Sequence, residues 1–254
     1  MNRNIEAQYK TSKNLSTRIS IHEKYSTNKQ PFGDWIVEHY EIRPGFQILE
    51  LGCGTGDMWK GKLNMLPTDA HLLLSDFSAG MLETAKKVLG NHQQVDYQSI
   101  DIQDIPFADA SFDMVIANMM LYHVPDLHKG LSEVRRVLKP GRKFYCATYG
   151  EHGIMEFIND TLHDQGIHGE IGKTFTLQNG EGILQQHFDC VQMDIRDDGL
   201  EITDISDFVD YVMSLSSLTG TVESSCQDLY QAFREKSTNG ILYVPKEYGM
   251  FICK

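Results

Sequence analysis

The chain has 254 residues, of which 41% are hydrophobic and 10% aromatic, so it can bury the core of an α/β domain with an appended piece. Its 35 acidic residues outnumber 23 basic ones, and because a formal charge of −12 repels a polyanion, we expect no nucleic-acid partner. The N-terminal residues lack the apolar stretch of a signal peptide and no later apolar run is long enough for a membrane span, so we expect a cytoplasmic protein without membrane insertion.

The first residues of the chain combine aromatic and basic side chains. Tyr9, Arg18, His22 and Tyr25 precede the segment PFGDWIVEHY, which is typical of a helix leading into a first strand. For Arg18 and Tyr25, a solvated helix face is the alternative to a functional role.

Strands and helices alternate through the middle of the chain. Five short apolar or alternating runs predict strands at 47–51, 71–76, 96–101, 113–119 and 143–149. Between them, SAGMLETAKKVLG predicts a helix with Ser78 as its N-cap and Gly90 as its stop. A second helix carries Leu127 to Leu138 at helical spacing and ends where KPG, 139–141, breaks the chain. This alternation predicts right-handed crossovers and a mostly parallel sheet, whose ligands lie beyond the carboxyl ends of the strands.

The last hundred residues predict the remaining elements of the sheet. A helix is expected at 180–188, a sixth strand at 189–195 and an antiparallel closing strand at 247–254. Two inserted helices are expected at 205–218 and 224–237, in a position where they could cap an acceptor pocket. The apolar stripe Phe208, Val209, Val212 and Leu215 favours core packing, so the neighbouring Tyr211 and Met213 are not assigned to a substrate.

The stretch ILELGCGTGD places Gly52, Gly54 and Gly56 directly after the first strand. Asp57 stands where a dinucleotide fingerprint has its third glycine, and we expect it to open a helix whose N–H groups it satisfies itself. The glycines let a ligand approach the backbone, while Glu50 and Asp57 favour an ammonium or sulfonium group over a phosphate. The alternative is an ordinary tight turn between strand and helix.

Polar residues also end the next three predicted strands. Asp76 could accept hydrogen bonds from ribose hydroxyls, although a helix cap is the alternative. Asp101 could accept from an adenine amino group while Ile102 packs against the ring, or it could be a turn residue. Asn118 interrupts an apolar run at the end of the fourth strand. Four such strand ends in succession indicate one binding site.

These segments together resemble a known family. ILELGCGTG, LLLSDFSAGML, SIDIQDIPFADASFDMVIANMMLYHVPD and LSEVRRVLKPGRKF are similar to the successive motifs of class I S-adenosylmethionine-dependent methyltransferases, in the ubiquinone/menaquinone C-methyltransferase-like branch of methyltransferase type 11. The resemblance covers about residues 30 to 150. It implies a Rossmann-like α/β fold: a mostly parallel seven-stranded sheet with helices on both faces and an antiparallel last strand.

The resemblance also implies a domain organisation. Residues 1–30 would form an N-terminal helical lid over the cofactor, and residues 31–254 a single methyltransferase domain. Its cofactor-binding core would be 31–150, with a helical insertion at about 200–240.

By the same resemblance, the glycine loop contacts the methionine part of S-adenosylmethionine, Asp76 the ribose, Asp101 and Ile102 the adenine, and Asn118 the region beside the transferred methyl. The implied cofactor-binding set is Glu50, Gly52, Cys53, Gly54, Gly56, Asp76, Phe77, Met81, Asp101, Ile102 and Asn118. In the lid, Arg18 would pair with the methionine carboxylate, and Tyr25 would line the acceptor pocket as a catalytic-site residue.

The expected activity is methyl transfer to a small-molecule acceptor by in-line displacement, with release of S-adenosylhomocysteine. His123, five residues after Asn118, is the candidate base, and bracing of its loop is the alternative role. The five scattered cysteines and the spacing of the histidines indicate no metal site. The competing classes are a cofactor-binding module, a methyltransferase acting on a macromolecule and, disfavoured by the missing third glycine, an NAD-dependent oxidoreductase.

Overall fold

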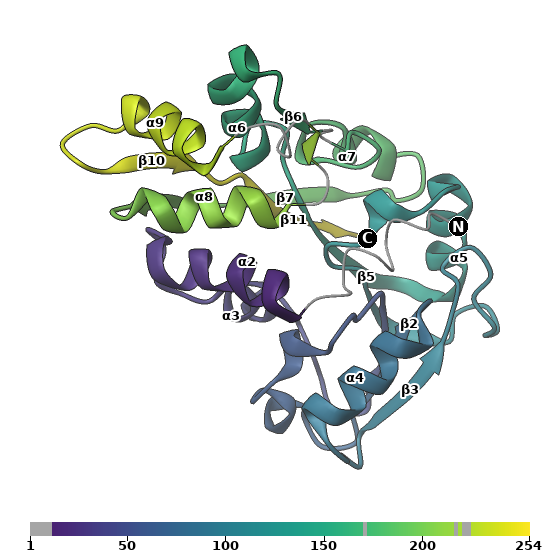
Figure 1. Cartoon of the computed structure of the whole chain (residues 1–254). Helices are drawn as coiled ribbons and strands as arrows, with labels where there is room; N and C mark the ends of the chain where they lie inside the picture. The colour runs from purple at the N-terminus through teal and green to yellow at the C-terminus, as the bar shows by residue number, and fades with distance from the viewer. Residues whose placement is uncertain (1–11, 170–171, 216–217, 220–224) are drawn as a thin grey trace. The chain divides into compact units, whose positions relative to one another are not determined.

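The computed structural model describes residues 12–169, 172–215, 218–219 and 225–254, and the chain forms two compact units (Figure 1). The helical unit consists of Met1–Lys29, Gly150–Ile171 and Arg196–Glu247. The sheet unit consists of Gln30–Tyr149, Gly172–Ile195 and Tyr248–Lys254.

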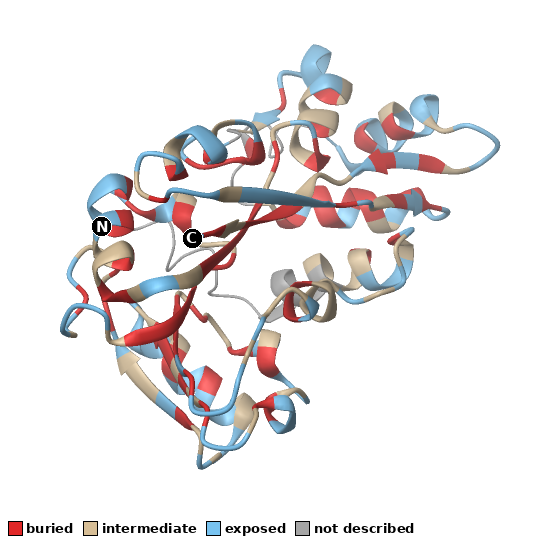
Figure 2. Cartoon of the chain, turned by 180° about the vertical axis from the view of Figure 1, so that it is seen from behind, coloured by how far each residue is buried: buried red, intermediate tan, exposed pale blue. Residues whose placement is uncertain are grey.

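The sheet unit is built on a seven-stranded sheet with the order β3-β2-β1-β4-β5-β11-β7. Neighbouring strands among β3, β2, β1, β4 and β5 pair in parallel. β11 pairs antiparallel with β5, which confirms the expected fold. The strands are β1 Gln47–Leu51, β2 His71–Asp76, β3 Val95–Ser99, β4 Phe112–Ile116, β5 Leu138–Tyr149, β7 Val191–Arg196 and β11 Tyr248–Cys253. β4 is buried at all five positions, as expected for a central parallel strand covered on both faces. Buried residues, drawn red in Figure 2, lie on strands and on helices alike.

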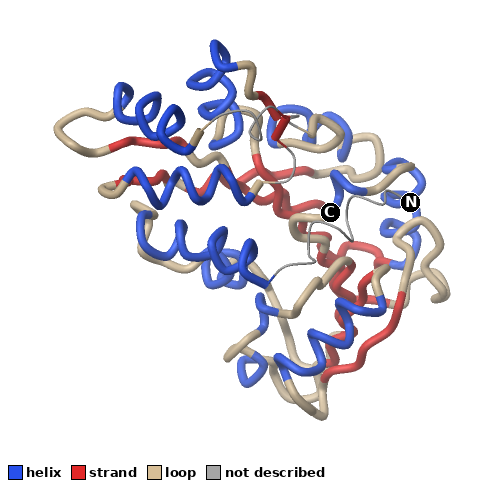
Figure 3. Tube along the Cα trace, in the orientation of Figure 1, coloured by secondary structure: helices blue, strands red, loops and turns tan. Residues whose placement is uncertain are grey.

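Helices cover both faces of this sheet (Figure 3). They are α3 Phe32–Glu38, α4 Ala79–Leu89, α5 Leu127–Val137 and α7 Leu177–Leu184, with 3₁₀ turns at η1 Asp57–Trp59, η2 Leu63–Met65 and η3 Leu121–His123. Ile48 of β1 packs in the core with residues of α3 and α4, whereas the next residue, Leu49, packs with α5 and α7. Alternation of side chains along the strand therefore gives the sheet two separate cores.

The predicted cap and stop of α4 are confirmed, and α5 ends before 139–141 as predicted, but the chain continues there as a strand. Ser78 caps α4 by accepting from the Met81 N–H at 3.4 Å, and Gly90 ends the helix. Residues 139–141, in contrast, lie inside β5, which starts directly after α5. The register of β5 against β4 shifts between Phe112 and Met114, so the extra residues form an irregularity within the strand rather than a break.

The helical unit has its own core. It contains α2 Ser12–Tyr25, α6 Ile154–Leu162, α8 Ile205–Ser214, α9 Cys226–Lys236 and the turn η4 His163–Gln165. Two antiparallel pairs, absent from the sequence-based expectations, complete it: β8 Gly199–Ile202 with β10 Leu242–Pro245, and β6 His168–Gly169 with β9 Leu218–Thr219. The stripe on α8 packs in this core, as expected, and Met213 is exposed.

The N-terminal helix α2 is part of this core. Ile21 of α2 is 2% exposed and packs with residues of α8 and β8. The helical unit unites 1–29 with 150–171 and 196–247. The expected organisation, a lid at 1–30 and one methyltransferase domain over 31–254, stays a prediction. Tyr9 lies outside the described residues.

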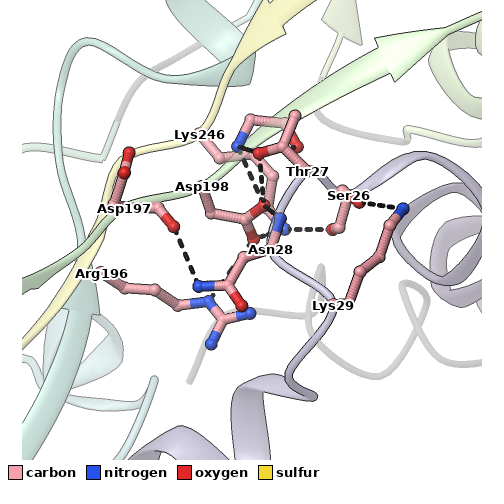
Figure 4. Close-up of polar contacts among 9 residues, drawn as sticks. Ser26, Thr27, Asn28, Lys29, Arg196, Asp197, Asp198 and Lys246 are labelled. Atoms are coloured by element: carbon pink, nitrogen blue, oxygen red, sulfur yellow. Dashed lines mark hydrogen bonds and ion pairs between the residues drawn. The ribbon is translucent and has the colours of Figure 1, made fainter.

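A buried ion pair joins three segments of the helical unit (Figure 4). The Asp198 carboxylate accepts from Lys246 Nζ, from Asn28 N at 3.2 Å and from Gly199 N at 2.9 Å. Lys246 Nζ also donates to Ser26 Oγ at 2.8 Å. Burial alone would raise the pKa of Asp198, but the hydrogen bonds from Lys246 and Asn28 outweigh it and lower the pKa. The carboxylate is therefore held ionised inside the unit.

Among the helices of the described ranges, none combines the length and the apolar character needed to cross a membrane.

Candidate functional site

The carboxyl ends of four neighbouring strands carry the predicted site residues. The order β3-β2-β1-β4 sets these ends side by side, with Leu51 opposite Ser75, Asp76 opposite Ser99 and Glu50 opposite Ile116. The glycine loop, Asp76, Asp101 and Asn118 therefore follow one another along a single edge of the sheet.

The glycine loop has a backbone that favours glycine. Gly52, Gly54 and Gly56 have φ of 69°, 56° and 76°, in the left-handed region. A Cβ on Gly52 would lie 2.8 Å from Met120 Cβ, whereas a Cβ on Gly54 would meet nothing within 4 Å. The backbone at Gly54 can thus be approached by a ligand.

Asp76 ties this loop to the end of β2. Its Oδ2 accepts from Gly54 N at 2.9 Å, and its Oδ1 accepts from Ser78 N at 2.8 Å. Each carboxylate oxygen has a second lone pair that could receive a hydroxyl. Phe77 is 55% exposed beside it, and Met81 lies half-buried in the first turn of α4.

Glu50 lies inside the core instead of on the surface of the site. It is 2% exposed and accepts from the indole N–H of Trp59. Burial raises the pKa of Glu50 to about 7. Burial and the nearby Glu50 also raise the pKa of the Cys53 thiol, which is therefore neutral. The sequence predicted that Glu50 favours a cationic ligand, and with a pKa of about 7 its side chain carries a charge only in the fraction that is ionised.

The helix expected at Asp57 is absent. Gly56 leads instead into the three-residue turn η1, and the Asp57 carboxylate accepts from Thr55 Oγ1 at 2.6 Å. A single 3₁₀ turn does not present the array of free N–H groups that a helix N-terminus offers to a phosphate.

Asp101 and Ile102 differ in accessibility. The half-exposed Asp101 accepts at Oδ1 from Gln103 N at 2.8 Å, which is the geometry of a turn residue. Gln103 Nε2 donates to Oδ1 at 3.1 Å and to Oδ2 at 3.4 Å, so Oδ2 keeps one lone pair for a ligand. Ile102 is 5% exposed and packs against Gly130 of α5. The predicted contact of Ile102 with adenine therefore contrasts with a side chain that fills the core.

Asn118 is likewise turned inward and is 8% exposed. Its Nδ2 donates to the Tyr40 hydroxyl at 2.6 Å, and its Oδ1 accepts from Ala147 N at 3.0 Å. The amide is thus engaged at both ends within the sheet unit.

An aromatic group follows the ends of β4 and β5. The exposed His123 lies in η3, with its ring centroid 4.4 Å from that of Tyr122, which is 4.7 Å from that of Tyr149. Desolvation lowers the pKa of His123, so the neutral imidazole can accept a proton at pH 7. Tyr149 was not predicted for the site, and its position as the last residue of a predicted strand was the available signal.

Arg18 and Tyr25 belong to the helical unit, where both bond to α8. Arg18 donates to Ser214 Oγ at 3.4 Å and to the Ser214 carbonyl, and Tyr25 donates to Asp207 at 2.6 Å. Their cofactor and acceptor roles stay predictions. In the part of the chain that is described, no three His, Cys, Asp or Glu side chains are grouped to hold a metal ion.

Known proteins match the segment that contains these strand ends. Residues 49–146 match a family model described as a methyltransferase domain. The chain is 40% identical over 105 residues to the demethylmenaquinone methyltransferase of Clavibacter sepedonicus, covering 41% of this chain and 42% of that protein. It is 31% identical over 140 residues to the ubiquinone/menaquinone biosynthesis C-methyltransferase UbiE of Brucella anthropi, covering 53% and 52%. The chain thus spans about half the length of the curated relatives it matches.

Solved structures share the fold over a larger part of the chain. Phosphoethanolamine N-methyltransferase 2 of Haemonchus contortus, solved with S-adenosylhomocysteine, aligns with a TM-score of 0.59 at 17% identity, over 99% of this chain and 60% of that one. The [4+2]-cyclase SpnF aligns with a TM-score of 0.53 at 15% identity, over 87% and 80%. At these identities the likeness concerns the fold alone.

Proposed function

We propose that the chain transfers a methyl group from S-adenosylmethionine to a small-molecule acceptor and releases S-adenosylhomocysteine. The match of residues 49–146 to a methyltransferase domain supports this proposal. The observation that carries the proposal is the bond between the Gly54 N–H and Asp76. It fixes the glycine loop against the end of β2, while the space beside Gly54 stays open.

The residues at this edge fit the proposed cofactor. Backbone groups of Gly52 to Gly56 would hold the methionine part, and the free lone pairs of Asp76 would accept from the ribose hydroxyls. Asp101, half-exposed at the next strand end, would accept from the adenine amino group. The ionised form of Glu50 would favour a cationic ligand nearby. When bound, S-adenosylmethionine supplies an activated methyl on a sulfonium.

The protein's own contribution would be alignment and the removal of one proton. Methyl transfer proceeds by in-line displacement, so the backbone after β4 must hold the acceptor in line with the sulfonium. A neutral His123 could take a proton from a phenol, enol or carbon acid. Tyr122 and Tyr149 give an aromatic surface beside it.

The first acceptor to test is a short-chain demethylmenaquinol, because the Clavibacter sepedonicus relative is a demethylmenaquinone methyltransferase. The acceptor class is part of this proposal, as is the cytoplasmic location, which rests on the sequence. SpnF shares the fold but is a cyclase, which makes cofactor binding without methyl transfer the second candidate.

Binding and turnover together test the proposal. Calorimetry should show binding of S-adenosylmethionine and S-adenosylhomocysteine but not of NAD. Labelled methyl groups from S-adenosylmethionine should then appear in a metabolite extract or in the quinol. Binding of NAD alone would overturn the assignment, and cofactor binding without any labelled product would favour the second candidate.

A further inference from the structure

The turn after β4 is held by a side chain that replaces a strand hydrogen bond. The hydrogen bonds between β4 and β5 continue beyond the last residue of β4. Ala117 N donates to Tyr145 O at 2.9 Å, and Met119 N donates to Ala147 O at 2.8 Å. In a regular parallel ladder the Ala147 N–H between them would donate to the carbonyl of Ala117. It donates instead to Asn118 Oδ1 at 3.0 Å. The amide of Asn118 therefore determines where the regular ladder ends.

This turn has a strained backbone and contacts the glycine loop. Met119 has φ of 53°, in the left-handed region that is uncommon for residues other than glycine. The next residue, Met120, packs so closely on Gly52 that a Cβ there would lie 2.8 Å from it. The turn consequently brings the end of β4 against the loop that follows β1.

Tyr40 fixes the other end of the Asn118 amide. Its hydroxyl accepts from Asn118 Nδ2 at 2.6 Å. Its ring lies 5.2 Å from Tyr145 and 6.2 Å from Trp59, whose indole donates to Glu50. Phenylalanine would fill the same space in this aromatic cluster, but it would leave the buried Asn118 N–H without its acceptor.

We infer that Tyr40 is a positioning residue for the proposed methyl transfer: it acts through Asn118 to set residues 118–120 and the contact of Met120 with Gly52. The inference rests on the proposed function. It assigns Asn118 to the support of the site instead of to a ligand contact, and it extends the site to a tyrosine that follows α3.

Two tyrosine variants separate positioning from packing. Tyr40→Phe removes the hydroxyl that bonds Asn118, and the matched control Tyr145→Phe removes a neighbouring buried hydroxyl that accepts from Glu41 N at 3.3 Å. We expect both variants to fold with similar Tm. Tyr40→Phe alone should speed amide exchange of residues 117–122 by about tenfold, the effect of losing one buried hydrogen bond. Equal exchange in the two variants would overturn the inference whatever the acceptor is.

Turnover of the short-chain demethylmenaquinol supplies a second readout. We expect Tyr40→Phe to lower kcat by about tenfold through misalignment, with the Kd for S-adenosylmethionine within about threefold of wild type. Asn118→Leu should have a similar effect, and the double variant should be no slower than Asn118→Leu alone. If the loss of kcat in the double variant equalled the product of the two single losses, Tyr40 would not act through Asn118 and the inference would be refuted. Failure of the wild type to bind S-adenosylmethionine would instead refute the proposed function.

Discussion

Two carboxylates near the glycine loop have opposite surroundings. Asp76 is half-exposed and receives two backbone N–H groups, whereas Glu50 is buried and receives one indole N–H. Backbone donors stabilise a carboxylate, while burial favours the neutral acid. Asp76 is thus placed to accept hydrogen bonds, and the charge of Glu50 changes with pH.

Glu50 should make stability depend on pH. Because its folded pKa of about 7 exceeds the ordinary 4.5, the folded state holds the proton more tightly, and stability should fall from about pH 4.5 and level off above about pH 7. The loss amounts to about 3 kcal/mol at 1.4 kcal/mol per pH unit. Urea unfolding between pH 5 and 8 measures this effect. The free energy of unfolding of Glu50→Gln should not fall with pH in this way, whereas that of the exposed-site control Glu38→Gln should fall as in the wild type. A wild-type curve parallel to that of Glu50→Gln would contradict the prediction.

Replacing Asp76 should weaken cofactor binding. Asp76→Ala removes the acceptor of the Gly54 N–H and the proposed ribose contact, at a cost of about 1.5 to 3 kcal/mol in the binding free energy of S-adenosylmethionine. Ser78→Ala is the matched control because it removes only the cap of α4. Calorimetry measures both, and circular dichroism verifies the fold. Equal affinities in the two variants would leave Asp76 as a turn residue.

At the level of elements, α2 is joined to the start of β8 and the end of β10 by the Asp198 cluster (Figure 4). Thr27 N also donates to Gly199 O at 2.9 Å, and Ser26 forms a β-bridge with Leu200. Backbone hydrogen bonds and the Asp198 carboxylate therefore both hold the residues after α2 against the start of β8.

Asp198→Asn should destabilise the helical unit. The side chain of Asp198 is fully buried and those of Lys246 and Arg196 are nearly so, so neutralising the carboxylate removes a buried negative charge that both cations contact. Breaking a buried pair in this way costs about 3 to 5 kcal/mol. Thermal unfolding should show a lowered Tm, while Asp197→Asn, at an exposed neighbour, should change it little. Matching Tm values would show that the ion pair contributes nothing net.

At the scale of the whole molecule, each unit has its own hydrophobic core. The strand-end residues of the proposed cofactor site all belong to the sheet unit, and Arg18 and Tyr25 belong to the helical unit. Cofactor binding and the stability of the helical unit can therefore be separated by mutation.

Ile21→Asp tests that separation. It places a charge where Ile21 is 2% exposed and should destabilise the helical unit by several kcal/mol. S-adenosylhomocysteine binds the folded site, so it should still raise the unfolding temperature of the sheet unit in this variant. Calorimetric scans with and without the ligand measure both effects, with the exposed-site variant Glu23→Gln as control. Loss of the ligand-induced shift would show that the site requires an intact helical unit.

The sequence by itself determined the parts of this protein that depend on near neighbours. Apolar runs located β1 and β2 to the residue, Ser78 and Gly90 bounded α4, and the glycine loop with Asp76 indicated the sheet edge at which we propose the site. Periodicity and capping act over a few residues, so their signals are complete within a short window.

The tertiary structure decided what depends on distant partners. Glu50 is buried because Trp59 packs on it, Asn118 is turned inward because Tyr40 and Ala147 bond its amide, and Ile102 fills a space opposite Gly130. The division into two units likewise arises because α2 packs with residues from 150 onwards. A strand-end side chain can face the ligand edge or the core, and only the groups that surround it in the folded chain select between the two.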